Sequence, residues 1–227
     1  MSNAPKRDGA WPFPGYSPGC EGFAGLVRLL RRGGTACLPT DTTYGLIARA
    51  AAEAAVERVY RLKGRPRDKA LVCLIGAADW VERYCEPRKD NWLIPARRFW
   101  PGPLNLVLPA GPQLPRAPLA GGRTVALRVP DDELLLELLA VLNEPLVAPS
   151  ANPAGKPPAL SVDQAYGYFG EDIPCYVDGG SADSSVVSTI IDLVGSPPRL
   201  LRQGRISPEE LRRLPGLAEL VLSTRAR

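Results

Sequence analysis

The stretch Leu62-Lys63-Gly64-Arg65-Pro66-Arg67-Asp68-Lys69-Ala70-Leu71 joins an alanine-rich run to an apolar run. Pro66 removes a backbone donor, fixes its own φ and pushes Arg65 toward an extended conformation. We therefore predict that this stretch forms a stiff loop, named the basic loop below, between a helix and a strand. Its cations suit a polyphosphate or carboxylate ligand, because Arg offers a planar fork of donors and Lys a point charge. A solvated surface loop is the alternative. The stretch contains one acid, Asp68, and four cations: Lys63, Arg65, Arg67 and Lys69.

Helices and strands intermix on both sides of this loop. Apolar residues at helical spacing predict helices over 23–32, 51–62, 79–84, 95–100, 131–142, 161–169 and 207–214. Short apolar runs predict strands over 35–39, 70–75, 104–109, 124–129, 146–148, 175–177, 186–193 and 199–201. Only a loop separates strand 104–109 from strand 124–129, and the same holds for strands 186–193 and 199–201. Parallel and antiparallel pairing must therefore mix in the sheet. We predict a single-domain α/β fold with a twisted open mixed sheet flanked by helices.

The composition excludes several kinds of chemistry. The chain has 227 residues, a net charge of +4 and no histidine. The absence of histidine excludes a Ser-His-Asp triad, a Cys-His pair and a His-ligated metal. No Gly-x-Gly-x-x-Gly or Walker-type motif is present, which argues against a Rossmann or P-loop site. The chemistry must rely on positioning, cations and hydroxyl groups.

The five cysteines are scattered, odd in number and form no Cys-x-x-Cys pair. This pattern argues against a zinc site and against a disulfide framework. We therefore expect a reducing compartment, and a fold whose melting temperature depends on neither metal nor disulfide.

The sequence predicts three segments. Residues 1–21 form an arm rich in proline, glycine and aromatic residues, whose Trp11, Phe13 and Tyr16 could pack on the body. Residues 22–222 form the domain, and residues 223–227 a tail. No apolar stretch resembles a signal peptide or reaches membrane-spanning length. We expect a cytoplasmic protein without a membrane partner.

Polar side chains follow two predicted strands. Thr40, Asp41, Thr42 and Thr43 come after strand 35–39, and Ser150-Ala151-Asn152 after strand 146–148. Ligands of α/β sheets gather beyond the carboxyl ends of strands, although Asp and Thr also open ordinary turns. Arg128 lies near the end of an apolar strand, where it needs an anion. That anion could be a structural partner or a ligand carboxylate. In the second case, Arg128 is solvated or water-bridged before the ligand binds.

Several motifs in this order resemble the YrdC-like family, from about residue 22 to about residue 205. The stretches that carry the resemblance are Pro39-Thr40-Asp41-Thr42-Thr43-Tyr44-Gly45-Leu46, Lys63-Gly64-Arg65-Pro66 with Lys69, Trp100-Pro101-Gly102-Pro103, Val125-Ala126-Leu127-Arg128-Val129-Pro130, Ser150-Ala151-Asn152 and Ser188-Thr189-Ile190-Ile191-Asp192. The family often has proline then leucine after the Lys69 position, where this chain has Ala70-Leu71. It usually has threonine where this chain has Asn105.

The resemblance implies a nucleotidyltransferase that makes threonylcarbamoyl-AMP. Its substrates are L-threonine, bicarbonate and ATP, and pyrophosphate is released. Partner proteins transfer the threonylcarbamoyl group to the adenosine next to the anticodon of tRNA. The implied fold is a twisted open α/β sheet with a positively charged concave face. The resemblance also implies Mg²⁺, held mainly by the ATP phosphates and water, and no protein metal site.

The resemblance also assigns residues by position. Lys63 and Arg65 are implied as catalytic, and both contact the ATP phosphates. The remaining implied ATP-binding residues are Lys69, Thr124, Ser150, Asn152 and Arg202. The implied threonine-binding residues are Thr42, Arg128, Ser188 and Thr189. Replacing Lys63 or Arg65 is expected to weaken ATP binding with little change in melting temperature.

Two other functions stay open at this point. The first is an RNA-binding module without catalysis, which would use the basic face. The second is a YrdC-like paralogue that adenylates another carbamoyl substrate. ATP consumption separates the first from the enzymes, and dependence on threonine separates the second.

Overall fold

The computed structural model describes residue 20 and residues 22–86, 92–182 and 186–223. The predicted arm therefore lies outside the described residues apart from Cys20, and so does the tail apart from Ser223. Within the described part, one mixed sheet runs through the molecule in the order β10-β9-β8-β4-β5-β3-β6-β2-β1-β7. The strands are β1 (Ala36–Leu38), β2 (Gly45–Arg49), β3 (Val72–Leu74), β4 (Leu104–Pro109), β5 (Thr124–Arg128), β6 (Leu146–Val147), β7 (Cys175–Tyr176), β8 (Thr189–Asp192), β9 (Arg199–Arg202) and β10 (Val221–Leu222).

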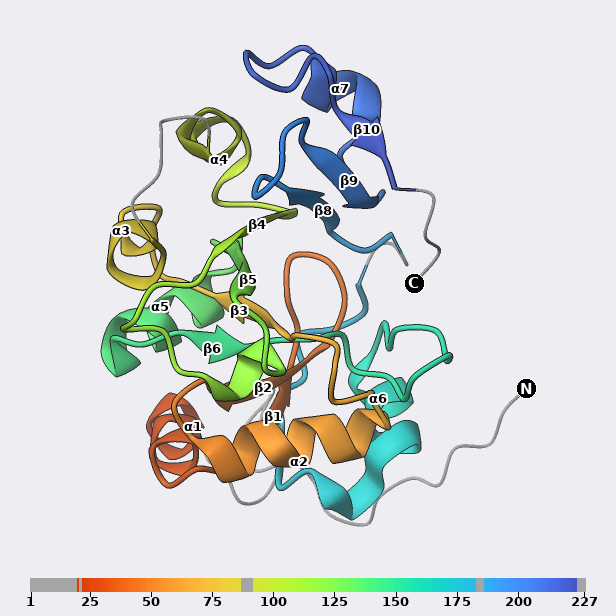
Figure 1. The fold of residues 1–227 in the computed structure, drawn as a ribbon. Coiled ribbons are helices and arrows are strands. Elements are labelled where there is room, and N and C mark those ends of the chain that lie inside the picture. Colours follow the sequence, from red (N-terminus) through yellow and green to blue (C-terminus); the bar gives the residue numbers. More distant parts are fainter. Residues whose placement is uncertain (1–19, 21, 87–91, 183–185, 224–227) are drawn as a thin grey trace, which may run out of the picture.

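The helices flank this sheet (Figure 1). They are α1 (Gly22–Arg31), α2 (Glu53–Lys63), α3 (Trp80–Tyr84), α4 (Leu93–Phe99), α5 (Glu133–Leu142), α6 (Val162–Phe169) and α7 (Pro208–Arg212). Figure 1 shows α2 and α6 at the β1–β2 end, α4 beside β4 and α7 beside β10. The part of the chain that the structure describes also contains two short 3₁₀ turns, Ala117–Leu119 and Gly170–Asp172. The predicted α/β fold with a mixed open sheet is confirmed.

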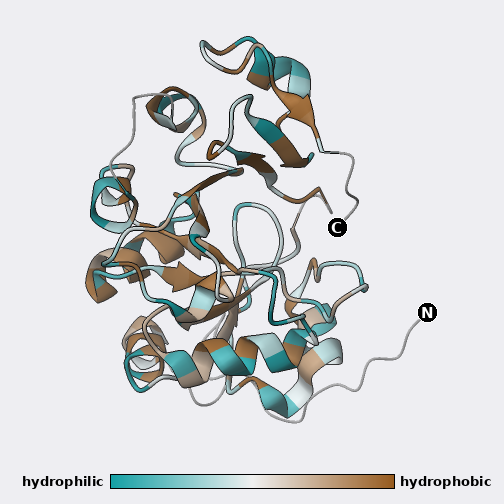
Figure 2. Ribbon diagram, in the orientation of Figure 1, coloured by the Kyte–Doolittle hydropathy of each residue, from teal (hydrophilic) through white to brown (hydrophobic). Residues whose placement is uncertain are grey.

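Alternation along the strands builds two hydrophobic cores, one on each face of the sheet. In β1, Cys37 packs into one core while Ala36 and Leu38 pack into the other. The second core also holds apolar side chains of α1 and α5, and the first holds those of α2. Because helices cover both faces, the central strands are mostly hydrophobic, as their colour in Figure 2 shows.

The ends of α2 and α5 are fixed by local chemistry. Gly64 adopts a left-handed conformation, φ 57°, and caps α2, donating its N–H to backbone carbonyls of the last turn. Asp132 caps the start of α5 by accepting a hydrogen bond from Leu135 N at 2.9 Å. The first cap turns the chain directly into the basic loop, which therefore begins at a defined point.

Two strands escaped prediction, and several are shorter than expected. The first missed strand, β2, begins at Gly45, shortly after the polar residues 40–43, and pairs antiparallel with β1. β10 consists of Val221 and Leu222 at the sheet edge. β8 covers Thr189–Asp192, whereas residues 186–193 were expected in strand. The stretch before β8 instead carries Ser188, a side chain of the candidate site.

One expectation from the cysteines is wrong. Cys20 and Cys175 form a disulfide that links the segment before α1 to β7, across 155 residues of sequence. Both residues are fully buried. Cys37, Cys73 and Cys85 are free and buried, so they behave as small core residues. The disulfide is at odds with the reducing compartment that the spacing suggested.

Candidate active site

A cavity of about 300 Å³ opens where the loop after β1, the basic loop, the loop after β6 and the start of β8 converge. Five cations line it: Lys63, Arg65, Lys69, Arg128 and Arg202. Apolar residues line part of it, and so do seven hydroxyl and amide side chains: Thr40, Thr42, Thr43, Asn105, Ser150, Asn152 and Ser188. A polar cavity with this many cations suits an anionic ligand that carries hydroxyl groups.

Lys63 ends α2 and is 5% exposed. Its Nζ donates to the carbonyl oxygens of Ser150 and Asn152, the latter at 2.8 Å. Lys63 O in turn accepts from Ala154 N at 2.6 Å. Lys63 thus ties the end of α2 to the loop after β6. We therefore expect its replacement to cost stability, rather than to cause the little change in melting temperature that the sequence suggested.

The loop after β6 is held by its own side chains. Ser150 Oγ donates to Asn152 Oδ1 at 2.6 Å. Asn152 Nδ2 donates to the carbonyl oxygens of Pro153 and Lys156 at 3.0 and 2.7 Å. Ser150 and Asn152 therefore line the cavity as predicted, but they use their side-chain donors to shape the loop.

The basic loop divides its cations between the cavity and the surface. Arg65 Nε donates to Lys69 O at 3.0 Å, and its Nη2 to Ala70 O at 2.8 Å. These bonds close the loop and hold Arg65 at the cavity wall. Arg67 instead forms an exposed ion pair with Glu57. The alternative of a solvated surface loop therefore fits Arg67 and not Arg65.

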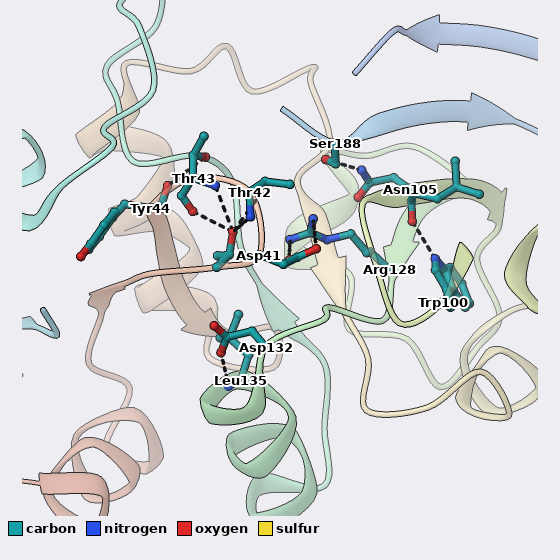
Figure 3. Close-up of polar contacts among 12 residues, drawn as sticks. Asp41, Thr42, Thr43, Tyr44, Trp100, Asn105, Arg128, Asp132, Leu135 and Ser188 are labelled. Carbon is teal, nitrogen blue, oxygen red and sulfur yellow. Dashed lines mark hydrogen bonds and ion pairs between the residues drawn. The ribbon is translucent and has the colours of Figure 1, made fainter. Parts of the chain in front are cut away.

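Arg128 at the end of β5 is 4% exposed and forms an ion pair with Asp41 at 3.1 Å (Figure 3). The expectation of a solvated or water-bridged Arg128 is therefore wrong. Asp41 Oδ2 accepts a hydrogen bond from Nη1 at 3.5 Å, whereas Oδ1 lies 3.1 Å from Nη2 as an ion-pair contact without a hydrogen bond. Among the described residues, Arg128 Nε is buried without a hydrogen-bond partner. Burial lowers the pKa of Arg128, and Asp41 opposes this shift. The edge that carries Nε is left for a second acceptor.

A single hydroxyl organises the loop that carries Asp41. Thr40 Oγ1 donates to Thr43 O at 2.7 Å and accepts from the backbone N–H of Thr42 at 3.1 Å. Tyr44 anchors the far end of the loop, because its OH donates to Gly180 O at 2.7 Å. Burial raises the pKa of Tyr44 to about 12, so it stays protonated. The loop therefore presents Asp41 and Thr42 in a fixed arrangement.

Ser188 also lines the cavity, and it contacts residues of two strands. Its Oγ is 2.7 Å from Asn105 Nδ2, on β4, and 3.0 Å from Arg202 Nη2, on β9. Arg202 Nε also donates to Ser188 O at 3.0 Å. Figure 3 shows the Asn105–Ser188 pair near Arg128. Cation, amide and hydroxyl are thus held as one unit.

The structure brings most predicted site residues together. Lys63, Arg65, Lys69, Ser150, Asn152 and Arg202 line the cavity, and so do Thr42, Arg128 and Ser188. Two predicted residues lie outside its lining. Thr124 begins β5, at the end opposite Arg128. Thr189 is fully buried, and its hydroxyl donates to Ile206 O at 2.8 Å while accepting from the backbone N–H groups of Gly204 and Ile206.

Two contributors were not assigned to the site from the sequence. Asp41 pairs with Arg128 although 87 residues separate them. Asn105 looks in the sequence like a single polar residue within an apolar strand. That pattern was the available signal, since a fully buried amide needs partners.

Comparisons with known proteins place the chain in a family. The Sua5_yciO_yrdC family model, described as Telomere recombination, matches residues 28–204. The threonylcarbamoyl-AMP synthase of Pyrococcus abyssi is 41% identical, over 82% of this chain and 55% of that protein. The threonylcarbamoyl-AMP synthase of Bacillus subtilis is 37% identical, over 83% of this chain and 55% of that protein.

A solved structure extends the comparison to three dimensions. The crystal structure of P. abyssi Sua5 complexed with L-threonine matches with a TM-score of 0.83 and 38% identity, over 88% of this chain and 58% of that one. The chain thus spans just over half the length of these relatives. Because the family model covers most of the chain and the fold agrees, the chain belongs to the Sua5/YciO/YrdC family.

Proposed function

We propose that this chain makes threonylcarbamoyl-AMP from L-threonine, bicarbonate and ATP, with release of pyrophosphate. The observation that carries the proposal is the cavity itself, where a buried Arg128–Asp41 pair and two hydroxyl side chains adjoin four further cations. A small amino acid with a carboxylate and a hydroxyl suits the first part, and a triphosphate suits the second. The names of the two relatives support the same reaction.

The proposed roles follow from the lining. Arg65, Lys69 and Arg202 neutralise the triphosphate, with Lys63 behind them at the end of α2. Arg128 binds the threonine carboxylate along its Nε edge while Asp41 holds its other edge. Thr42 and Ser188 contact the threonine side chain. Ser150 and Asn152 shape the loop that faces the nucleotide. Thr124 and Thr189 are left without a ligand contact, because neither lines the cavity.

The proposed chemistry has two steps. The neutral threonine amine attacks bicarbonate, a C–N bond forms, and water leaves to give the carbamate. A carbamate oxygen then attacks the α-phosphorus, the bond to the β-phosphate oxygen breaks, and pyrophosphate leaves. Alignment and charge neutralisation carry such a transfer, so no histidine is required.

Mg²⁺ would travel with the triphosphate and add positive charge at the phosphate oxygens. The described residues contain no group of three or more His, Cys, Asp or Glu side chains suited to a metal. The strongly cationic lining instead suits a ligand that carries its own metal.

The wider biological role is part of the same proposal. The product would serve threonylcarbamoyladenosine formation in tRNA, with partner proteins that transfer the group. A cytoplasmic location stays a prediction, and the Cys20–Cys175 disulfide does not favour it. Direct tRNA binding by a positively charged concave face stays a prediction. None of the described helices is long and apolar enough to cross a membrane.

Pyrophosphate release tests the proposal and separates its rivals. Release should require ATP, L-threonine and bicarbonate together, so omitting any one should abolish it. An RNA-binding module without catalysis would give no release under any condition. Release that ignores threonine but responds to another carbamoyl donor would favour the paralogue.

Lys63 makes a pH-dependent prediction about ATP binding. Burial and then the neighbouring Arg65 lower the pKa of Lys63 to about 7 from 10.5. At pH 8 the free enzyme therefore holds mostly the neutral amine, and a bound triphosphate favours the ammonium form. ATP binding should take up a proton at pH 8 and much less at pH 6, where the amine is already charged. Titration calorimetry in buffers of different ionisation enthalpy measures this uptake.

The control variants separate the two lysines of the cavity. Lys63→Met should abolish the proton uptake, and Lys69→Met should retain it. A binding enthalpy at pH 8 that is independent of the buffer in the wild type would show that Lys63 does not sense the phosphates.

A further inference from the structure

The hydroxyl of Ser188 has both of its acceptor positions filled by protein donors. Asn105 Nδ2 lies 2.7 Å and Arg202 Nη2 lies 3.0 Å from Ser188 Oγ. A serine hydroxyl has two acceptor lone pairs and one hydrogen, and a guanidinium can only donate. If the amide nitrogen of Asn105 also donates, both lone pairs of Ser188 Oγ are occupied. Ser188 can then form a further hydrogen bond only by donating its own hydrogen.

The orientation of the Asn105 amide is fixed by a third group. Asn105 Nδ2 lies 3.1 Å from Thr189 O, and a carbonyl oxygen can only accept. The amide atom that faces both Thr189 and Ser188 is therefore the nitrogen, and its two hydrogens are used by these two oxygens. Asn105 is fully buried, so water does not compete for them.

The hydroxyl hydrogen of Ser188 is left for the cavity. Ser188 lines the cavity, and within the described part of the chain its Oγ takes part in hydrogen bonds only as an acceptor. Rotation about its C–O bond cannot exchange donor for acceptor without breaking a bond to Asn105 or Arg202. Ser188 therefore offers a ligand a hydrogen-bond donor only.

Thr42 can supply the complementary acceptor. Thr40 Oγ1 gives its only hydrogen to Thr43 O at 2.7 Å, and its two lone pairs accept from the backbone N–H groups of Thr42 and Thr43 at 3.1 and 3.3 Å. The contact of 3.1 Å between the Thr42 and Thr40 hydroxyls therefore fixes no direction for Thr42. Thr42 lines the cavity, and its hydroxyl oxygen can accept a hydrogen bond from a ligand.

We infer that Asn105 is a positioning residue that selects a substrate hydroxyl by fixing Ser188 as a donor. Together with Thr42, the cavity then presents one donor and one acceptor. A hydroxyl group satisfies both, since it accepts from Ser188 while donating to Thr42. A methyl group satisfies neither and leaves two buried polar groups without partners. This inference rests on the proposed function, because it concerns how the amino-acid substrate is read.

A double-mutant cycle tests the inference. Titration calorimetry with L-threonine is carried out on wild type, Asn105→Leu, Ser188→Ala and the double variant. Each single change should weaken threonine binding roughly tenfold, because one hydrogen bond to substrate is lost. The double variant should bind no more weakly than Ser188→Ala, because Asn105 acts through the Ser188 hydroxyl. Additive losses, on the order of a hundredfold in the double variant, would overturn the inference.

A second ligand separates a positioning role from a purely structural one. L-valine replaces the threonine hydroxyl by a methyl group of similar size. Asn105→Leu should reduce the preference for threonine over valine and leave the affinity for valine itself unchanged. Equal weakening of both ligands would mean that Asn105 only supports the fold. Val107→Ala, on the same strand outside the cavity lining, is the control and should keep the wild-type preference.

The outcomes also distinguish this inference from the proposed function. Wild type without threonine-dependent pyrophosphate release would remove the function itself. Wild type with that release but with an additive cycle would remove only the role of Asn105. If Asn105→Leu does not fold, the threonine preference of Ser188→Ala decides: an undiminished preference over valine contradicts the inference.

Discussion

Replacing Arg128 by lysine is expected to weaken threonine binding by about a hundredfold or more, with ATP binding changed much less. The estimate follows from losing charge-assisted hydrogen bonds to the threonine carboxylate, each of which contributes about 1.5–3 kcal/mol. Lysine keeps the charge opposite Asp41 but cannot hold Asp41 with one edge and a substrate carboxylate with the other. Titration calorimetry with L-threonine and, separately, with ATP measures both affinities.

A matched variant guards against an indirect effect. Arg205→Lys makes the same change close to Arg128 but outside the lining of the cavity, and it should leave threonine binding intact. The melting temperature of Arg128→Lys must be recorded alongside. Normal threonine binding by Arg128→Lys, or selective loss of ATP binding, would show that Arg128 is a structural partner of Asp41 or a phosphate contact.

Removing the Cys20–Cys175 disulfide should give the largest change in stability. A crosslink that spans 155 residues strongly restricts the unfolded chain. Cys175→Ser is expected to lower the free energy of unfolding by about 2–5 kcal/mol. For a chain of this size, that corresponds to a melting temperature lower by roughly 5–15 °C. A strong reductant should lower the melting temperature of the wild type by a similar amount.

The reductant also provides the controls. It should have no further effect on Cys175→Ser, because the crosslink is already gone. Cys85→Ala removes one of the free cysteines and should respond to reductant as the wild type does. Five titratable thiols in the denatured, unreduced protein, rather than three, would mean that the disulfide is not formed.

Local patterns in the sequence predicted the elements better than the pairings between them. The basic loop, its preceding helix and the strand that carries Arg128 follow from spacing, Pro66 and hydrophobicity. β2 was missed because Gly45–Arg49 is buried on both faces and shows no alternation of polar residues. A run of five residues after a polar turn carries little signal of its own.

The parts of the site that escaped prediction are contacts between distant segments. Asp41 pairs with Arg128, and Cys20 with Cys175, because the folded sheet brings these distant segments together. Spacing rules for cysteines concern near neighbours and are silent on such a pair. Likewise, the role of Asn105 depends on what lies opposite it on β8 and β9. Residue type indicates which residues are candidates for the site. Which of them form hydrogen bonds with one another depends on the fold.

The identity of the product tests the central claim most directly. Wild-type protein is incubated with ATP, Mg²⁺, L-threonine and ¹³C-labelled bicarbonate, and the adenylate product is analysed by mass spectrometry. The proposed reaction predicts an adenylate that contains both threonine and one ¹³C atom, formed in equal amount with pyrophosphate. An adenylate without ¹³C or without threonine, or no adenylate at all from folded protein, would contradict it.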